Sequence, residues 1–209
     1  MRFVGCWRME SDAIARVLTV LSLVKTLETL NEQDMATNLE FKAQCQSLES
    51  FYPRLADLNA TYHETVRQID TYFYVPSEKC QPRLKLREID EITEAWLIYY
   101  ERPNMEASRY SQYQLCEIAN PVTLKALLTA ALGIKTIVKK QRELWMFNHT
   151  RIHLDTVADL GQFVELETVF QGQTETEAVN EHQHVKTILR LETADPVAVS
   201  YSDLIVQRS

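Results

Sequence analysis

Charged residues alternate with apolar residues along several short stretches of the 209-residue chain. The clearest stretch holds the cations Arg83, Lys85 and Arg87, separated by Leu84 and Leu86. Residues two apart on a β-strand project from the same face, so these three cations would share one side of a strand. Other stretches repeat the spacing with cations, carboxylates or both: Glu40 and Lys42; Lys140 and Arg142; Arg151, His153 and Asp155; Glu165 and Glu167. Such rows can bind a ligand that has several negative charges.

Two arrangements explain an ionic face on a strand. In most antiparallel sheets this face is simply the side in contact with water. Alternatively, the sheet closes and its ionic faces look inward. The water-facing arrangement is favoured for any single strand, but two features weaken it for the set: cations gather on some stretches and carboxylates on others, and Tyr72, Tyr99 and Tyr113 near them indicate a partly enclosed space. Two like charges ~6 Å apart repel by roughly 3 kcal/mol at an effective dielectric constant of about 20, so inward cations require a bound anion.

The residue types indicate which anion and which metal the site suits. Arginine and lysine hydrogen-bond phosphate oxygens, and several together can hold a chain of phosphates. Carboxylates are oxygen ligands, which suit Mg²⁺ or Mn²⁺ rather than zinc. The combination predicts a polyphosphate site with a divalent metal. His153, which lies in the same row as Arg151, is either a base or phosphate ligand, or a hydrogen-bonded structural histidine.

Composition excludes several common functional classes. The formal net charge of −7 argues against a wide surface that binds nucleic acid. The four glycines are never spaced as G-x-G or G-x-x-x-x-G-K, so the sequence lacks the phosphate loops of Rossmann and P-loop proteins. The four cysteines form no C-x-x-C pair and predict neither a zinc cluster nor a dense disulfide scaffold. Phosphate must therefore be bound by side chains.

Neither a membrane span nor a secretion signal is indicated. The chain has no run of about 18 apolar residues. Glu10, Asp12 and Arg16 precede the apolar stretch 17–24, where a secretion signal has only basic residues. We therefore expect a cytoplasmic protein with no membrane partner and no nucleic-acid partner.

The elements expected to position the charged rows are mostly β-strands. Strands are predicted over 38–43, 68–75, 83–89, 95–101, 112–118, 135–147, 150–157 and 161–170. Helices are predicted over 47–58, between the caps Asn120 and Gly133, and from the Thr174–Glu177 capping box to Leu191. Many consecutive strands with few helices predict an α+β protein built on an antiparallel barrel or a strongly curved sheet.

Seven segments of the chain match one known family. They are NLEFKA (38–43), QIDTYF (68–73), PRLKLREI (82–89), IYYERP (98–103), TIVKKQRELW (136–145), TRIHLDTVADLGQFVELE (150–167) and SYSDLI (200–205). Through them the chain resembles the CYTH superfamily, the triphosphate tunnel metalloenzymes, and within it the class IV adenylyl cyclase-like branch. The resemblance implies an antiparallel β-tunnel with flanking helices that encloses a triphosphate-containing small molecule.

The resemblance also implies roles for individual residues. The family signature E-x-E-x-K corresponds here to Asn38, Glu40 and Lys42, so the first glutamate is missing and metal binding should be weaker or involve a different number of ions. The implied ligands of Mg²⁺ or Mn²⁺ are Glu40, Glu165 and Glu167, with Asp155 as a further candidate. The implied triphosphate-binding residues are Lys42, Arg83, Lys85, Arg87, Lys140, Arg142 and Arg151, of which Lys42, Arg87 and Arg151 are the predicted catalytic residues. Asp70 is expected to orient the cations.

Residues 1–34 precede the part that resembles the family. Apolar residues recur at three- and four-residue steps over 13–30, which predicts an amphipathic helix. Met35 stands where related proteins often begin. We therefore predict an N-terminal helical extension at 1–34 and a tunnel domain at 35–209. The extension either packs against a partner, such as a second copy in a homodimer, or reflects an upstream start chosen in error.

Three functions are consistent with such a tunnel. If water attacks the terminal phosphorus, the protein is a hydrolase of inorganic triphosphate, thiamine triphosphate or a nucleotide. If the ribose 3′-hydroxyl attacks the α-phosphorus, the protein is a class IV adenylyl cyclase that converts ATP to cyclic AMP and pyrophosphate. The missing glutamate keeps open a third hypothesis, a non-catalytic sensor of polyphosphate or nucleotide.

Overall fold

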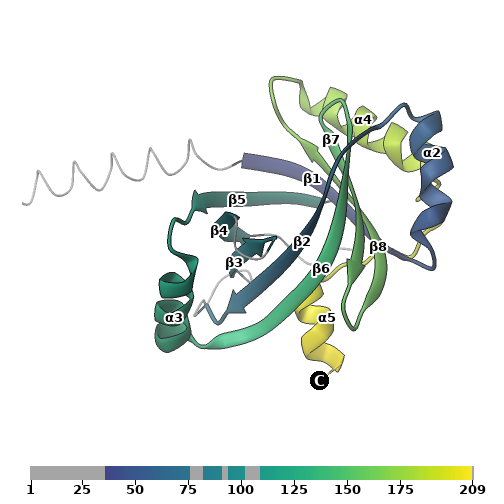
Figure 1. The fold of residues 1–209 in the computed structure, drawn as a ribbon. Helices are drawn as coiled ribbons and strands as arrows, with labels where there is room; N and C mark the ends of the chain where they lie inside the picture. The colour runs from purple at the N-terminus through teal and green to yellow at the C-terminus, as the bar shows by residue number, and fades with distance from the viewer. Residues whose placement is uncertain (1–35, 76–81, 91–93, 102–108, 209) are drawn as a thin grey trace, which may run out of the picture. The chain divides into compact units, whose positions relative to one another are not determined.

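A closed antiparallel β-barrel forms the centre of the computed structural model (Figure 1). The structure describes residues 36–75, 82–90, 94–101 and 109–208. Eight strands in this part of the chain follow the order β1-β5-β4-β3-β2-β6-β7-β8, and β8 pairs with β1 to close the barrel. They are β1 (Ala36–Cys45), β2 (Thr61–Phe73), β3 (Arg83–Ile89), β4 (Glu94–Glu101), β5 (Arg109–Glu117), β6 (Ile134–Phe147), β7 (Thr150–Val157) and β8 (Gly161–Val169). The predicted antiparallel barrel with flanking helices is confirmed.

Each predicted strand is present, and β3 and β7 have the predicted bounds. β2 differs most, because it begins at Thr61 rather than at residue 68. Its first half pairs with the far end of β6, starting with Thr61 opposite Met146. Most side chains over 61–67 are exposed. This half of the strand therefore lacks the alternation of buried and exposed residues by which a sequence reveals a strand.

The helix predicted over 47–58 is divided in two. A 3-10 helix, η1 (Leu48–Phe51), is followed directly by the short α-helix α2 (Tyr52–Asp57). Pro53 lies in the first turn of α2. A proline fits there because the first turn needs no N–H, whereas inside a longer helix it would break a hydrogen bond. Proline therefore explains why one predicted helix becomes two.

The remaining helices are α3 (Pro121–Leu132), α4 (Glu175–Ile188) and α5 (Tyr201–Arg208). α3 begins at the predicted cap Asn120 and ends at Gly133, whose φ of 75° suits a residue without a side chain. α4 begins with the predicted capping box, in which Thr174 and Glu177 each bond the other's backbone N–H. α5 is not among the predicted elements.

The apolar faces of β1, β7 and β8 lie outside the barrel. Phe41, Ile152 and Leu166 pack there with the buried side chains of η1, α2 and α4. Figure 1 shows α2 and α4 covering this side of the barrel. Because alternate residues point in opposite directions, the ionic faces of the same strands look inward. The water-facing arrangement is therefore wrong for these strands, and the closed arrangement is correct.

A second apolar cluster closes one end of the barrel interior. It contains Tyr72, Val138 and Phe163 from the strands, together with Tyr201 from α5. The rings of Phe163 and Tyr201 meet edge to face, with centroids 4.9 Å apart. The C-terminal helix thus brings an aromatic side chain to the inside of the barrel.

Two sequence-based expectations cannot be compared with the structure. The extension at 1–34 and its amphipathic helix over 13–30 lie outside the described residues. Within the described residues, no helix has the length and apolar character needed to cross a membrane.

Replacing Leu166 by alanine should destabilise the protein strongly. Leu166 is fully buried between β8 and the covering helices. Removing its side chain leaves a cavity, so we expect the free energy of unfolding to fall by about 2–5 kcal/mol. Urea denaturation measures this change. The matched control is Leu127→Ala on α3, where the leucine is 62% exposed; its effect should stay within about 0.5 kcal/mol. Equal effects of the two changes would contradict the packing described here.

Candidate active site

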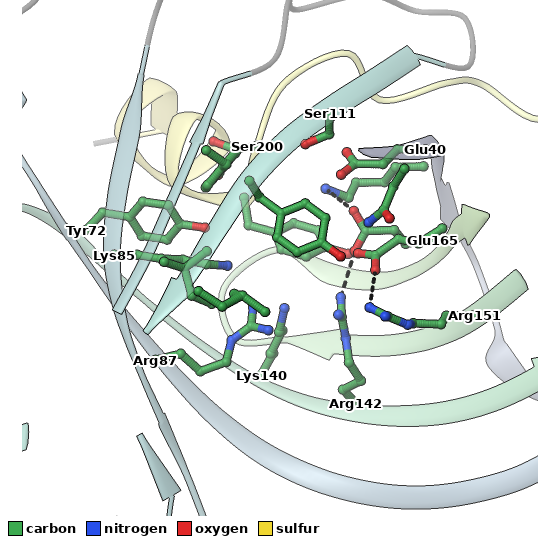
Figure 2. Close-up of a pocket in the computed structure, with 18 residues that line it drawn as sticks. Glu40, Tyr72, Lys85, Arg87, Ser111, Lys140, Arg142, Arg151, Glu165 and Ser200 are labelled. Atoms are coloured by element: carbon green, nitrogen blue, oxygen red, sulfur yellow. Dashed lines mark hydrogen bonds and ion pairs between the residues drawn. The ribbon is translucent and has the colours of Figure 1, made fainter. Parts of the chain in front are cut away.

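A pocket occupies the interior of the barrel (Figure 2). All eight described strands contribute side chains to it, and so do Tyr201, the first residue of α5, and Ser200 just before it. Its charged lining residues are Glu40, Lys42, Lys85, Arg87, Lys140, Arg142, Arg151, Glu165 and Glu167. These are the residues predicted to bind triphosphate or metal, with two exceptions. Arg83 and Asp155 do not line the pocket.

Arg83 lies at the closed end and fastens the C-terminal helix. Its guanidinium contacts the Asp203 carboxylate at 2.7 Å, and Lys135 contacts the same carboxylate at 2.9 Å. Burial alone would raise the pKa of Asp203, but hydrogen bonds from Arg83, Lys135 and Ser200 outweigh it and lower that pKa. The position of Arg83 therefore indicates that it holds α5 against β3.

Asp70 orients two cations of the pocket, as expected from the sequence. Its carboxylate accepts two hydrogen bonds from Arg87, at 2.7 and 2.9 Å, and one from Lys85 at 3.0 Å. Burial opposes ionisation, but the charges of Arg87, Lys85 and Lys140 hold the pKa of Asp70 well below its usual range. Asp70 is therefore an anion that fixes the direction of Arg87 and Lys85.

Asp155 has the same role on the other side of the pocket. It is completely buried and accepts two hydrogen bonds from Arg142, at 2.7 and 2.6 Å. The Tyr201 hydroxyl donates a third at 2.9 Å. Burial would raise the pKa of Asp155, but the charges of Arg142 and Lys140 dominate and lower it. With its oxygens engaged in this way, Asp155 is placed to orient Arg142 rather than to face a ligand in the pocket.

Glu165 lies between two cations inside the pocket. Lys42 contacts one carboxylate oxygen at 2.9 Å, and Arg142 contacts the other at 2.7 Å. The Lys42 ammonium also lies over the Tyr201 ring, 4.1 Å from its centroid. Burial opposes the charge on Glu165, yet Lys42, His153 and Arg142 together hold its pKa well below its usual range. Figure 2 shows the Arg142 side chain pointing toward Glu165.

Glu167 has longer contacts than Glu165. Arg151 lies 3.6 Å from one of its oxygens, and the His153 Nδ1 lies 3.7 Å from the other. In the sheet, Glu167 stands opposite Arg151 on β7 and opposite Glu40 on β1. Ligand atoms of His153, Glu165 and Glu167 lie within 4.8 Å of one another. These side chains are close enough to share one cation.

Buried atoms that lack a hydrogen-bond partner help to decide whether this cluster could bind a metal. The Oδ1 of Asn38 and the Nδ1 of His153 are buried and have no hydrogen-bond partner. A buried polar atom without a partner is unfavourable, so such atoms point to a ligand that completes the site. Asn38 lines the pocket and shares a strand face with Glu40. The donor set is therefore suited to a divalent cation, with oxygen as the main ligand atom.

Tyr201 is the residue of this site that sequence reasoning missed. Its ring lies under the ammonium groups of Lys42 and Lys140, at 4.1 and 5.3 Å, and its hydroxyl binds Asp155. The hydroxyl stays protonated, because burial and the nearby Asp155 charge raise its pKa well above the usual value. The segment SYSDLI offers a sequence signal only through family resemblance. Its short helix has no long apolar pattern.

The exposure of lining residues shows where the pocket opens. Leu115 is 53% exposed and the Arg151 side chain 37% exposed. Lys42 and Tyr201 are each only 4% exposed. The mouth therefore lies beside Leu115 and Arg151, and the closed end lies at Tyr201.

Two lysines in the pocket have lowered pKa values. Burial, with the added effect of the Arg142 charge, lowers the pKa of Lys140 to about 7. Burial and the charge of Arg87 lower the pKa of Lys85 to about 8. Without a bound anion, the pocket therefore disfavours the charged form of both lysines. A bound anion would favour the charged form.

Comparison with solved structures places this barrel among known folds. The PH1012 protein from Pyrococcus horikoshii OT3 aligns with a TM-score of 0.69 and 22% identity over 80% of this chain and 98% of that chain. A candidate adenylate cyclase from Vibrio parahaemolyticus aligns with a TM-score of 0.63 and 19% identity, over 81% and 97% of the two chains. A candidate adenylyl cyclase from Hippeastrum, described as having a dominant triphosphatase activity, aligns with a TM-score of 0.55 and 16% identity, over 83% and 95%. At these identities the likeness concerns the fold.

Comparison of sequences identifies the family. No curated protein matches the chain. The family model of the CYTH domain matches residues 36–201, which contain the whole barrel and end at Tyr201. Together with the closed barrel and its inward rows of cations and carboxylates, this match shows that the chain belongs to the CYTH domain family.

Proposed function

We propose that this protein is a metal-dependent hydrolase of triphosphate-containing molecules. The observation that supports the proposal is that cationic side chains from several strands converge on one pocket. Six cationic side chains line it: Lys42, Lys85, Arg87, Lys140, Arg142 and Arg151. A chain of three phosphates has several negative charges along its length, whereas a single carboxylate or phosphate would engage only part of this lining.

Electrostatics of the pocket favour a polyanion. Burial, more than any other cause, lowers the pKa values of Lys85 and Lys140, and the charges of Arg87 and Arg142 lower them further. A bound triphosphate would favour the charged form of both lysines, and this coupling contributes to binding. The two aspartates also fix Arg87 and Arg142 before the ligand arrives, so binding need not restrict these long side chains.

A divalent metal fits the carboxylate side of the same pocket. The residues that would hold it are Glu40, Glu165 and Glu167, with His153 in reach of the last two. Their oxygen atoms suit Mg²⁺ or Mn²⁺. When bound, such an ion would act as a Lewis acid that stabilises the negative charge developing on the phosphate chain. Asn38 adds a neutral oxygen where the family signature has a carboxylate.

In the proposed reaction, water attacks the terminal phosphorus and a diphosphate leaves. The terminal phosphate lies at the closed end, near Lys42, Lys140 and the Tyr201 ring. The arginines neutralise charge that develops on the oxygens of the leaving diphosphate. The Hippeastrum relative, with its described triphosphatase activity, supports hydrolysis as the first reaction to test.

Adenylyl cyclase activity is the second candidate. It is supported by the Vibrio parahaemolyticus relative, which is named as a candidate adenylate cyclase. A sensor without turnover is the third, because Asn38 removes one negative charge from the metal side. Incubating the protein with ATP and Mg²⁺ or Mn²⁺ separates the three. Orthophosphate identifies the hydrolase, cyclic AMP with pyrophosphate identifies the cyclase, and tight binding without product identifies the sensor.

Replacing Glu167 by glutamine should remove most metal-dependent turnover. The change keeps the size of the side chain but removes a charged ligand, so hydrolysis of inorganic triphosphate should fall by about 100-fold. Release of orthophosphate measures the rate. Glu64→Gln is the matched control, because Glu64 has an exposed side chain on the outer part of β2. A Glu167→Gln protein with the rate of the parent would exclude Glu167 from the metal site.

Affinity for inorganic triphosphate should fall as the pH rises from 7 to 9. Over this range Lys140 and then Lys85 lose their charge, because their pKa values are about 7 and about 8. A charge-assisted hydrogen bond contributes roughly 1.5–3 kcal/mol, so we expect a loss of at least about tenfold. Calorimetric titration in EDTA measures the affinity without metal. Lys140→Arg should flatten the profile because a guanidinium stays charged, whereas Lys139→Arg, at an exposed position, should not alter it. A flat profile for the parent protein would contradict the role of the lysines.

A further inference from the structure

His153 is a buried histidine on the inner face of β7. Its side chain is only 5% exposed, and it stands between Arg151 and Asp155 in the inward row of that strand. Across the sheet it stands directly opposite Glu165 on β8, and Glu167 follows two residues later on the same face of that strand. The fold therefore places this imidazole beside two carboxylates.

The Nδ1 atom of His153 is buried and has no hydrogen-bond partner among the described residues. It lies 3.8 Å from an oxygen of Glu165 and 3.7 Å from an oxygen of Glu167. Both distances exceed that of a hydrogen bond. Because a buried polar atom without a partner is unfavourable, its position indicates that a ligand completes this place.

The chemistry of the three side chains indicates a cation as that ligand. Two carboxylates attract positive charge, and a neutral imidazole offers a lone pair at Nδ1 when its proton is on Nε2. Two donor atoms can bind one ion when they are less than about 4.2 Å apart, which is twice a metal-to-ligand distance of about 2.1 Å. The distances from Nδ1 to Glu165 and to Glu167 are both below this limit.

Arg142 is the cation that could keep a metal ion away from this place. Its guanidinium lies 2.7 Å from the Glu165 oxygen that faces His153. Asp155 accepts two hydrogen bonds from the same guanidinium, at 2.7 and 2.6 Å, and its charge offsets that of Arg142. Arg142 therefore holds the Glu165 oxygen in position while adding little net positive charge.

A nitrogen ligand distinguishes between the two ions that the carboxylates suit. Mg²⁺ binds oxygen ligands and gives up its water reluctantly, whereas Mn²⁺ is a transition-metal ion that also accepts an imidazole nitrogen. Asn38 supplies a neutral oxygen where the family signature has a glutamate. With one carboxylate fewer, the nitrogen has a larger share in holding the ion.

We propose that the Nδ1 of His153 is a metal ligand together with Glu165 and Glu167, and that this nitrogen makes the site prefer Mn²⁺ to Mg²⁺. The proposal rests on the function proposed above, because it adds a ligand to the metal side of the same pocket and names the ion.

Pulsed electron paramagnetic resonance of bound Mn²⁺ tests the nitrogen ligand directly. The parent protein, loaded with Mn²⁺ in the absence of triphosphate, should show coupling of the ion to a directly bound nitrogen. Labelling of histidine alone with ¹⁵N should change this coupling. His153→Gln should abolish it, because a glutamine side chain binds cations through its oxygen. Absence of the coupling from the parent, or its survival in His153→Gln, would overturn the proposal.

Calorimetric titration with each ion measures the selectivity. His153→Gln should weaken Mn²⁺ binding by about tenfold or more and Mg²⁺ binding by no more than about threefold. His63→Gln is the matched control, because the His63 side chain is 61% exposed on β2; it should change neither affinity. Equal losses for the two ions in His153→Gln, or tighter binding of Mg²⁺ than of Mn²⁺ by the parent, would overturn the preference for Mn²⁺.

Neither measurement requires turnover, so the two proposals can fail separately. The expected nitrogen coupling and selectivity without any hydrolysis of triphosphate would overturn only the proposed reaction. Failure of the parent protein to bind either ion would overturn both the ligand and the metal-dependent function.

Discussion

Cations gathered inside a barrel need anions close to them, because their mutual repulsion is strong where little water is present to screen it. In this protein two buried aspartates meet part of that need. Asp70 contacts Arg87 and Lys85, and Asp155 contacts Arg142. Burial still disfavours the charged forms of Lys85 and Lys140 and lowers their pKa values. A bound anion would favour these charged forms, which makes the interior suited to an anionic ligand.

An ionic interior requires that the apolar core lie elsewhere. Here the strands direct Phe41, Ile152 and Leu166 outward, against η1, α2 and α4. The barrel therefore derives stability from its outer face and leaves its inner face for chemistry. This division also fixes the register, because a shift of one residue along β8 would turn the glutamates outward and Leu166 inward. Packing of the helices thus determines where the charged side chains point.

The C-terminal helix makes the two ends of the pocket different. Arg83 and Lys135 hold Asp203, and this contact keeps the neighbouring Tyr201 in the barrel interior. Tyr201 closes one end and contacts Lys42, Lys140 and Asp155. One end is therefore deep and cationic, and the other is open and partly apolar. A tunnel that was open at both ends would not distinguish the two ends of a triphosphate.

Patterns within the chain were enough to predict most of each strand except the first half of β2, two helix caps and the charged rows, because alternation and capping depend on residues close together in the chain. The resemblance to the family then predicted that these rows bind one common ligand. The folded chain was needed to find that Arg83 binds Asp203, 120 positions away, and that Asp155 lies behind Arg142 instead of lining the pocket. Both residues have the same two-residue spacing as their pocket neighbours, so spacing could not separate them. Their roles depend on which end of the barrel α5 covers, and that is settled by contacts between segments far apart in sequence.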